Sequence, residues 1–226
     1  MESSASLARL AGALYAVNIL AGLFCLMYVP THVIVHGDPA ATLSRLVAHE
    51  SLFRAGIAAN VIAHVAFLLL PLALYALLSP VNGKAAVVMV ALAVACLPID
   101  FVAIANQLDV LSLLRHAAVN PAAAPAQTQA AVWSLLGAYD NKLLVAEVFW
   151  GLWLLPFGYL VFKSGFLPSI LGICLMLGCF SYLIDFFQRL LAPQINLPGY
   201  VMLPAALGEM GIALWMLVMG AGRVRS

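Results

Sequence analysis

The sequence predicts an all-α membrane protein, a polytopic bundle of six transmembrane helices. Of its 226 residues, 65% are hydrophobic and only 8% are charged, whereas a soluble domain is about 45–50% apolar and about 25% charged. A soluble fold of this size cannot bury so much apolar surface. The net charge of +1 offers nothing to nucleic acid. We therefore exclude a soluble enzyme, a disordered chain and a nucleic-acid binder, and we expect a lipid bilayer around the protein.

Six apolar stretches are each long enough to cross a bilayer, for which a helix needs about 20 residues. Backbone groups find no water inside lipid, so these stretches must form helices. The alternation that is typical of membrane β-strands is absent from the sequence. We expect residues 1–226 to form one domain. Its predicted spans are residues 7–29, 53–78, 85–114, 132–162, 167–191 and 201–219.

The connection between the first two spans has a helical pattern of its own. Asp38 followed by Pro39 is typical of an N-cap and a first helical residue. Apolar residues then recur at helical spacing with polar residues between them, at Leu43, Leu46, Val47 and Phe53. We predict a short amphipathic helix at about 38–52, lying on the outer membrane interface. The segment 116–128, with its prolines and alanines, is predicted to be a loop.

Six spans place both termini on one side of the membrane, and basic residues mark the cytoplasmic side. The counts on the two sides are equal, but several residues of the second side neighbour acids, as Arg189 neighbours Asp185. We therefore predict that both termini are cytoplasmic. The first side carries Arg9, Lys84, Lys163, Arg223 and Arg225, and the second carries Arg45, Arg54, Arg115, Lys142 and Arg189.

A weak internal repeat relates spans two and three to spans four and five. Leu-Leu-Pro at 69–71 recurs at 154–156, and Ile-Asp-Phe recurs at the same spacing, around Asp100 and Asp185. Parallel repeats of this kind are related by an axis along the membrane normal. The repeat would place Asp100 and Asp185 at matching depths. In the alternative, the two acids simply meet different local partners.

Ionisable and amide side chains inside the spans are the candidate functional residues, because buried charges are costly in lipid and usually face a bundle interior or a wet cavity. At a rise of 1.5 Å per residue, four acids lie in the outer half of their spans: Asp100, Glu147, Asp185 and Glu209. Asn60 and His64 share a helix face, as do Asp100 and Gln107. We expect an outward-facing polar pocket formed by Asp100, Glu147, Asp185, Glu209, His64, Asn60 and Gln107, with Arg189 beside them.

Three interpretations of this pocket stay open. In the first, it binds or moves a small polar or amphiphilic solute, a cation or protons. In the second, each acid pairs with a nearby base or hydroxyl, as Asp185 with Arg189, and the protein is a structural or accessory membrane protein without a ligand. The third is a metal-dependent hydrolase embedded in the membrane. We take solute or proton binding as the function to test, and enzymatic activity is less favoured.

Histidines outside the spans are weak candidates for a metal site. His32 and His36 are four residues apart, and His49 follows on the same segment. Histidine nitrogens suit zinc or copper, but this spacing matches no established motif. Only His64 lies inside a span, whereas membrane hydrolases that resemble the alkaline ceramidases use several intramembrane histidines and a b-type haem uses a pair. We therefore predict no cofactor and no bound metal.

Short motifs along the whole chain carry a family resemblance. They are ARLAGALY at 8–15, ESLFR at 50–54, LSPVN at 78–82, GYL at 158–160, KSG at 163–165, LP at 167–168, ILG at 170–172, YLID at 182–185 and LGE at 207–209. In this order they resemble a bacterial family of six-span integral membrane proteins that carries only a domain-of-unknown-function label. The resemblance implies a protein of the bacterial inner membrane and implies no activity. Two of the motifs contain Asp185 and Glu209.

Overall fold

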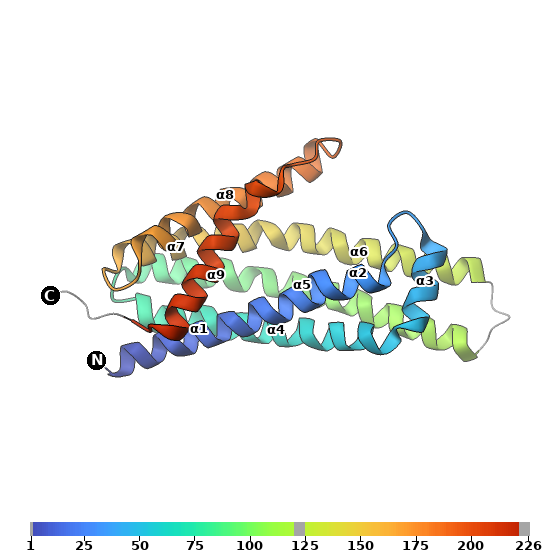
Figure 1. The fold of residues 1–226 in the computed structure, drawn as a ribbon, viewed down its shortest axis with the longest axis horizontal. Coiled ribbons are helices and arrows are strands. Elements are labelled where there is room, and N and C mark those ends of the chain that lie inside the picture. Colours follow the sequence, from blue (N-terminus) through green and yellow to red (C-terminus); the bar gives the residue numbers. More distant parts are fainter. Residues whose placement is uncertain (1, 120–124, 222–226) are drawn as a thin grey trace. The chain divides into compact units, whose positions relative to one another are not determined.

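Long apolar helices make up the protein, whose computed structural model describes residues 2–119 and 125–221 (Figure 1). Six helical segments in these residues are long and apolar enough to cross a bilayer, as the sequence predicts. Many large apolar side chains on them point away from the rest of the protein. The chain is therefore an integral membrane protein in contact with lipid. The spans are Ser4–Val33, Glu50–Leu78, Gly83–His116, Ala126–Lys163, Ser169–Leu191 and Gly199–Val218.

The helices follow one another with short connections. In chain order they are α1 (Glu2–Leu23), the π-helical stretch η1 (Phe24–Tyr28), α2 (Val29–Val33), α3 (Pro39–Ala48), α4 (Glu50–Leu78), α5 (Gly83–Val119), α6 (Pro125–Leu152), α7 (Leu154–Lys163), α8 (Ser169–Leu191), the 3₁₀ turn η2 (Gly199–Met202) and α9 (Leu203–Val218). The predicted loop at 116–128 is wrong where it is described, because α5 and α6 extend into it. Residues 120–124, Arg223 and Arg225 lie outside the described residues.

The chain divides into two compact units. The first unit comprises residues 1–18, 65–97 and 144–226, and the second comprises residues 19–64 and 98–143. That the six spans form one domain, and that they contain a parallel repeat, stay predictions.

In the first unit, helix α8 packs against α7 and α9 (Figure 1), and glycines lie at these contacts. A Cβ atom at Gly172 of α8 would lie 2.7 Å from the carbonyl oxygen of Gly158 of α7, and a Cβ at Gly208 of α9 would lie 2.8 Å from the backbone nitrogen of Leu175. Backbones approach this closely only where side chains are missing, which is how small residues let membrane helices associate. The buried Trp153 lies between α6 and α7 and stacks on Phe157.

In the second unit, a buried apolar cluster joins α2, α3, α4, α5 and α6. It includes Val29, Leu46, Phe53, Ile104 and Leu136. The predicted amphipathic helix is present as α3, with the Asp38 carboxylate accepting a hydrogen bond from the Ala41 N–H at 2.9 Å. Its apolar face packs into the protein through the fully buried Leu46. The helix is shorter than predicted, because α4 begins at Glu50; its place outside the membrane stays a prediction.

Candidate functional site

The eight residues predicted to share a pocket divide equally between the two units. The second unit contains Asn60, His64, Asp100 and Gln107, and the first contains Glu147, Asp185, Arg189 and Glu209. Each set of four makes contacts within its own unit. The sequence reasoning missed the tyrosines that bind these sets in both units.

Asn60 is the centre of the polar network in the second unit. Its side chain is completely buried, and its amide nitrogen donates hydrogen bonds to the Tyr139 hydroxyl at 3.0 Å and to the Gln107 carbonyl oxygen at 3.3 Å. The three residues belong to α4, α5 and α6, so the network connects three helices. The Asn60 side-chain oxygen has no hydrogen-bond partner among the described residues. A buried amide with an unused acceptor is costly, and water or a ligand would relieve that cost.

His64 and Asp100 form a second polar pair that adjoins Asn60. The His64 Nε2 atom lies 3.3 Å from an Asp100 carboxyl oxygen. The Nδ1 atom lies 2.8 Å from the backbone carbonyl oxygen of Asn60, one turn earlier on α4. Asp100 is completely buried and His64 nearly so. Burying such groups is tolerable only where their polar atoms are paired, and here the imidazole is paired on both sides.

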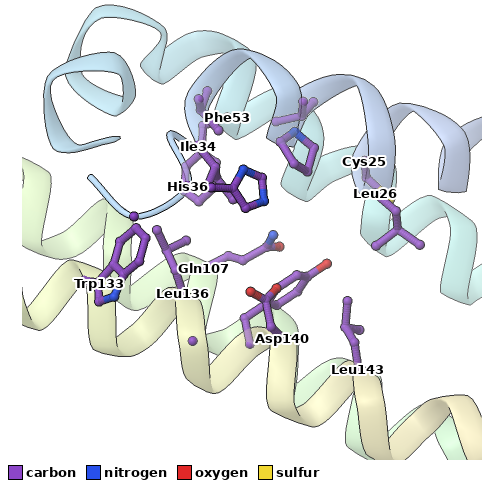
Figure 2. A pocket seen from close by; sticks show the side chains of 16 residues that line it. Cys25, Leu26, Ile34, His36, Phe53, Gln107, Trp133, Leu136, Asp140 and Leu143 are labelled. Atoms are coloured by element: carbon purple, nitrogen blue, oxygen red, sulfur yellow. The ribbon is translucent and has the colours of Figure 1, made fainter. Parts of the chain in front are cut away.

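A cavity of about 370 Å³ adjoins this network in the second unit. Gln107 and Tyr139, the two partners of the Asn60 amide, both line it, as do Asp140 and His36. Figure 2 shows His36, from the connection after α2, facing the Gln107 and Asp140 side chains of α5 and α6. Asp140 is exposed, and it takes part in an interaction within the protein. The polar network therefore reaches from buried Asp100 to an accessible wall.

The remaining wall of the cavity is apolar and aromatic. Phe53, Trp133 and Tyr139 contribute rings, and aliphatic side chains of η1, α2 and α6 complete the lining (Figure 2). The π-helical stretch contributes Cys25 and Leu26. Single π-helical turns inside α-helices are frequent at functional sites. The stretch η1 is such a turn, and it lies at the cavity wall, directly after the regular helix α1.

The loop beside the cavity is held in one conformation. The buried Thr42 hydroxyl accepts a hydrogen bond from the Val35 N–H at 2.9 Å and donates one to the Val35 carbonyl oxygen at 3.2 Å. Gly37 has φ of 76°, a left-handed conformation that glycine adopts without steric cost. Together these contacts fix His36 and Gly37 at the cavity wall.

The first unit pairs its acids within itself. The Glu209 carboxyl of α9 accepts hydrogen bonds from the Tyr15 hydroxyl of α1 at 2.7 Å and from the Tyr182 hydroxyl of α8 at 2.9 Å. On α8, Arg189 lies 2.8 Å from Asp185, an ion pair that the sequence predicts. Glu147 of α6 interacts with both members of this pair. The Glu209 contacts join three helices through one carboxyl group, whereas the Asp185–Arg189 pair lies within α8.

The weak metal candidates do not converge. Among the described residues, no three His, Cys, Asp or Glu side chains are grouped as a metal site. The His32 ring instead lies 4.3 Å from the Tyr28 ring, and its Nδ1 is 2.7 Å from the Tyr28 carbonyl oxygen. Of the three histidines proposed from the sequence, His36 alone lines the cavity described above.

Asp100 and Asp185, the proposed symmetry mates of the repeat, have different partners. Asp100 faces a histidine of the preceding span, whereas Asp185 pairs with an arginine four residues later on its own helix. This is the contact pattern expected if each acid simply meets its local partners. The repeat itself stays a prediction, because shared ancestry does not require shared contacts.

Comparisons with known proteins identify the family. A family model described as a domain of unknown function, DUF4386, matches residues 10–220. A protein of Archaeoglobus fulgidus described as uncharacterized is 29% identical over 85 residues, which are 38% of this chain and 50% of that protein. The match thus spans half the length of that relative. No solved structure matches the chain. The family match covers the six apolar spans nearly completely and agrees with the resemblance carried by the motifs, and the chain belongs to the DUF4386 family of integral membrane proteins.

Proposed function

We propose that the protein binds a small amphiphilic solute with a positively charged head group in the cavity of the second unit. The observation that carries this proposal is the cavity itself, whose wall includes two partners of the fully buried Asn60. Its volume of about 370 Å³ is at the small end of ligand sites, which span roughly 300–1,000 Å³. Such a volume suits a head group with a short apolar tail.

The preference for a cation follows from the lining. Asp140 is the one carboxylate among the described lining residues, and no lysine or arginine is among them. Phe53, Trp133 and Tyr139 add aromatic faces or edges, and aromatic faces attract organic cations. The aliphatic remainder of the wall accommodates a hydrocarbon tail. The carboxylate of Asp140 and the aromatic rings therefore both favour an organic ammonium ion over an anion.

We also propose that the cavity opens to the outside of a bacterial inner membrane, with both termini in the cytoplasm. The lining residues Ile34, His36 and Gly37 belong to the connection between the first two spans. This connection lies across one span from the N-terminus, where Arg9 is found. Basic residues near span ends favour the cytoplasmic side.

The test measures thermal stabilisation of the protein in lipid nanodiscs by two probes of equal chain length, n-hexylammonium and hexanoate. Ligand present at 100 times its Kd stabilises the folded state by about 2.7 kcal/mol. We expect n-hexylammonium to raise Tm more than hexanoate does, and Asp140→Asn to remove this difference. Equal effects of the two probes on the native protein would contradict the proposed preference.

Two glycine variants separate the cavity from the surrounding lipid. Gly137 of α6 lines the cavity, and a Cβ atom there meets no other atom within 4 Å. Gly22 of α1 is equally open and lies outside the lining. Both glycines are helical, so replacement with leucine raises helix propensity by a similar amount. We expect Gly137→Leu to abolish stabilisation by n-hexylammonium and Gly22→Leu to retain it. Retention in both variants would refute binding in the cavity.

A structural or accessory role is the second candidate, and the first unit favours it. There the carboxyl of Glu209 joins α1, α8 and α9 through two tyrosine hydroxyls. Such contacts stabilise a helix bundle without any ligand. If neither probe shifts Tm and Gly137→Leu behaves as Gly22→Leu does, this second candidate replaces the first.

A further inference from the structure

The imidazole of His64 has an oxygen atom at each of its two nitrogens. Nδ1 lies 2.8 Å from the Asn60 backbone carbonyl oxygen, and Nε2 lies 3.3 Å from an Asp100 carboxyl oxygen. A backbone carbonyl oxygen only accepts hydrogen bonds. Nδ1 must therefore carry a proton and donate it to Asn60. This contact fixes the tautomer, as second partners of histidines commonly do.

A second proton must then lie between Nε2 and Asp100. With Nδ1 protonated, a neutral imidazole has a bare Nε2, which would face a carboxylate lone pair. The contact is favourable only when one further proton is present, either on Nε2 as an imidazolium or on the carboxyl group. Both arrangements give the pair zero net charge, which suits its burial. Loss of that proton leaves one negative charge inside the unit.

Asn60 connects this pair to the cavity. Its backbone carbonyl accepts from His64, while its side-chain amide donates to Tyr139 and Gln107. Both of these partners line the cavity. Asn60 therefore contacts both His64, whose pair with Asp100 would change charge, and two residues of the cavity wall. Charges inside a protein interact strongly, because its low-dielectric interior screens them poorly.

We propose that His64 and Asp100 form a proton-binding site, and that a cation entering the cavity promotes release of the shared proton. The second part of this proposal, the effect of the cation on proton release, rests on the proposed function. The proton leaves the pair for bulk water, the pair becomes negatively charged, and the bound ammonium ion balances that charge. Linkage requires the reverse effect with the same factor, so that protonation of the pair weakens cation binding.

One further titratable side chain, the Tyr139 phenol of α6, interacts electrostatically with Asp100. Tyr139 interacts in the same way with Cys25 of η1 and with Asp140 of α6. The Phe101 ring is tilted relative to the imidazole, with the two ring centroids 6.1 Å apart.

The proton site is tested first, without any ligand. Histidine labelled with ¹⁵N reports the protonation of each ring nitrogen by NMR, and His64→Gln assigns the His64 signals among the five histidines. We expect Nδ1 of His64 to carry a proton throughout the pH range in which the protein is folded. A bare Nδ1 with a protonated Nε2 would overturn the proton site, whatever the cavity binds.

The coupling is tested by calorimetry of n-hexylammonium binding in two buffers that differ in ionisation enthalpy, which gives the protons released per ligand. We expect release of up to one proton, and an affinity that rises with pH by up to tenfold per unit while the pair titrates. His64→Gln and Asp100→Asn should remove both effects. Binding without proton release in the native protein would overturn the coupling.

Two controls distinguish the possible failures. Glu50→Gln removes a half-exposed acid that pairs with Arg54 in the same unit, and it should leave proton release unchanged. Asn60→Ala keeps the backbone carbonyl that holds His64 and deletes the amide that reaches the cavity. It should therefore keep the His64 tautomer and lower proton release. If n-hexylammonium fails to bind at all, the proposed function and the coupling fall together, and the NMR result alone decides the proton site.

Discussion

In the first unit the carboxyl group of Glu209 receives two tyrosine hydroxyls, at 2.7 and 2.9 Å, from two other helices. In the second unit the carboxyl group of Asp100 faces an imidazole at 3.3 Å, and the hydrogen bonds continue through Asn60 to a cavity wall. Both acids lie inside membrane spans. One network ends within the protein, whereas the other ends at a space that a solute could fill.

The difference shows that depth in a span is not enough to identify a functional acid. Hydroxyl donors satisfy a carboxyl group wherever they meet it, and the product is a tie between helices. An imidazole shares a proton with the carboxyl group and can exchange it. The nature of the partner therefore separates a structural acid from one able to do chemistry. The predictions below test this separation in order of expected effect.

The largest effect is expected where helices of the first unit touch at glycine. Gly172→Leu would place a side chain 2.7 Å from backbone atoms of Gly158 and Phe162, and such overpacking costs about 3 kcal/mol. Gly137→Leu in the second unit meets open space and should leave stability nearly unchanged. Unfolding in mixed micelles with increasing sodium dodecyl sulfate measures both. Equal losses would show that the close glycine contacts are not special to the first unit.

The second prediction concerns the tyrosines on Glu209. Tyr15→Phe and Tyr182→Phe each delete one of the two hydroxyl donors to the Glu209 carboxyl, and each should cost about 1 to 2 kcal/mol of unfolding free energy. Neither change should alter the affinity for n-hexylammonium. Tyr159→Phe, at an exposed position of the same unit, serves as the matched control. A loss of cation affinity in Tyr15→Phe would remove the proposed division of roles.

The third prediction concerns Asn60 in the second unit. Asn60→Ala should weaken binding of n-hexylammonium about tenfold, or about 1.4 kcal/mol, because Tyr139 and Gln107 lose the amide that orients them. Titration calorimetry gives the affinity. Unchanged affinity would mean that the buried network does not reach the ligand.

The spans and the contacts between residues close in the chain could be predicted from the sequence. The hydrogen-bond partners from distant parts of the chain could not. The spans follow from apolar runs alone, and local patterns gave the Asp38 cap and the Asp185–Arg189 pair, because their members are three or four residues apart. The hydroxyl of Tyr15 meets Glu209 across 194 positions. A tyrosine in an apolar span is as typical of packing as of hydrogen bonding, so no local signal marks it.

The sequence did not predict which residues line the cavity. Of the eight residues proposed for a pocket, Gln107 alone is among the lining residues. Helical periodicity paired Asn60 with His64 and Asp100 with Gln107, since each pair shares a helix face. The wall, however, also contains His36 from a loop and Asp140 from α6. Which loops and helices meet depends on tertiary packing, and periodicity along one helix carries no information about its neighbours. The helices can therefore be predicted from composition, whereas the residues of the site depend on contacts between helices.

The smallest effects are expected at two ion pairs of identical spacing, one in each unit. Glu50–Arg54 in the second unit is half-exposed, and Arg54→Ala should cost about 0.3 kcal/mol, as exposed i,i+4 pairs do. Arg189→Ala should cost more, about 1 kcal/mol, because Asp185 is less exposed and Glu147 lies beside it. Without Arg189 the two acids of the first unit lose their shared cation. The additional change Glu147→Gln should restore part of that loss in the Arg189→Ala background and have no such effect in the Arg54→Ala background. If the two arginine variants lose equal stability, Glu147 does not belong to the network, and the first unit joins its helices through Glu209 and its tyrosines alone.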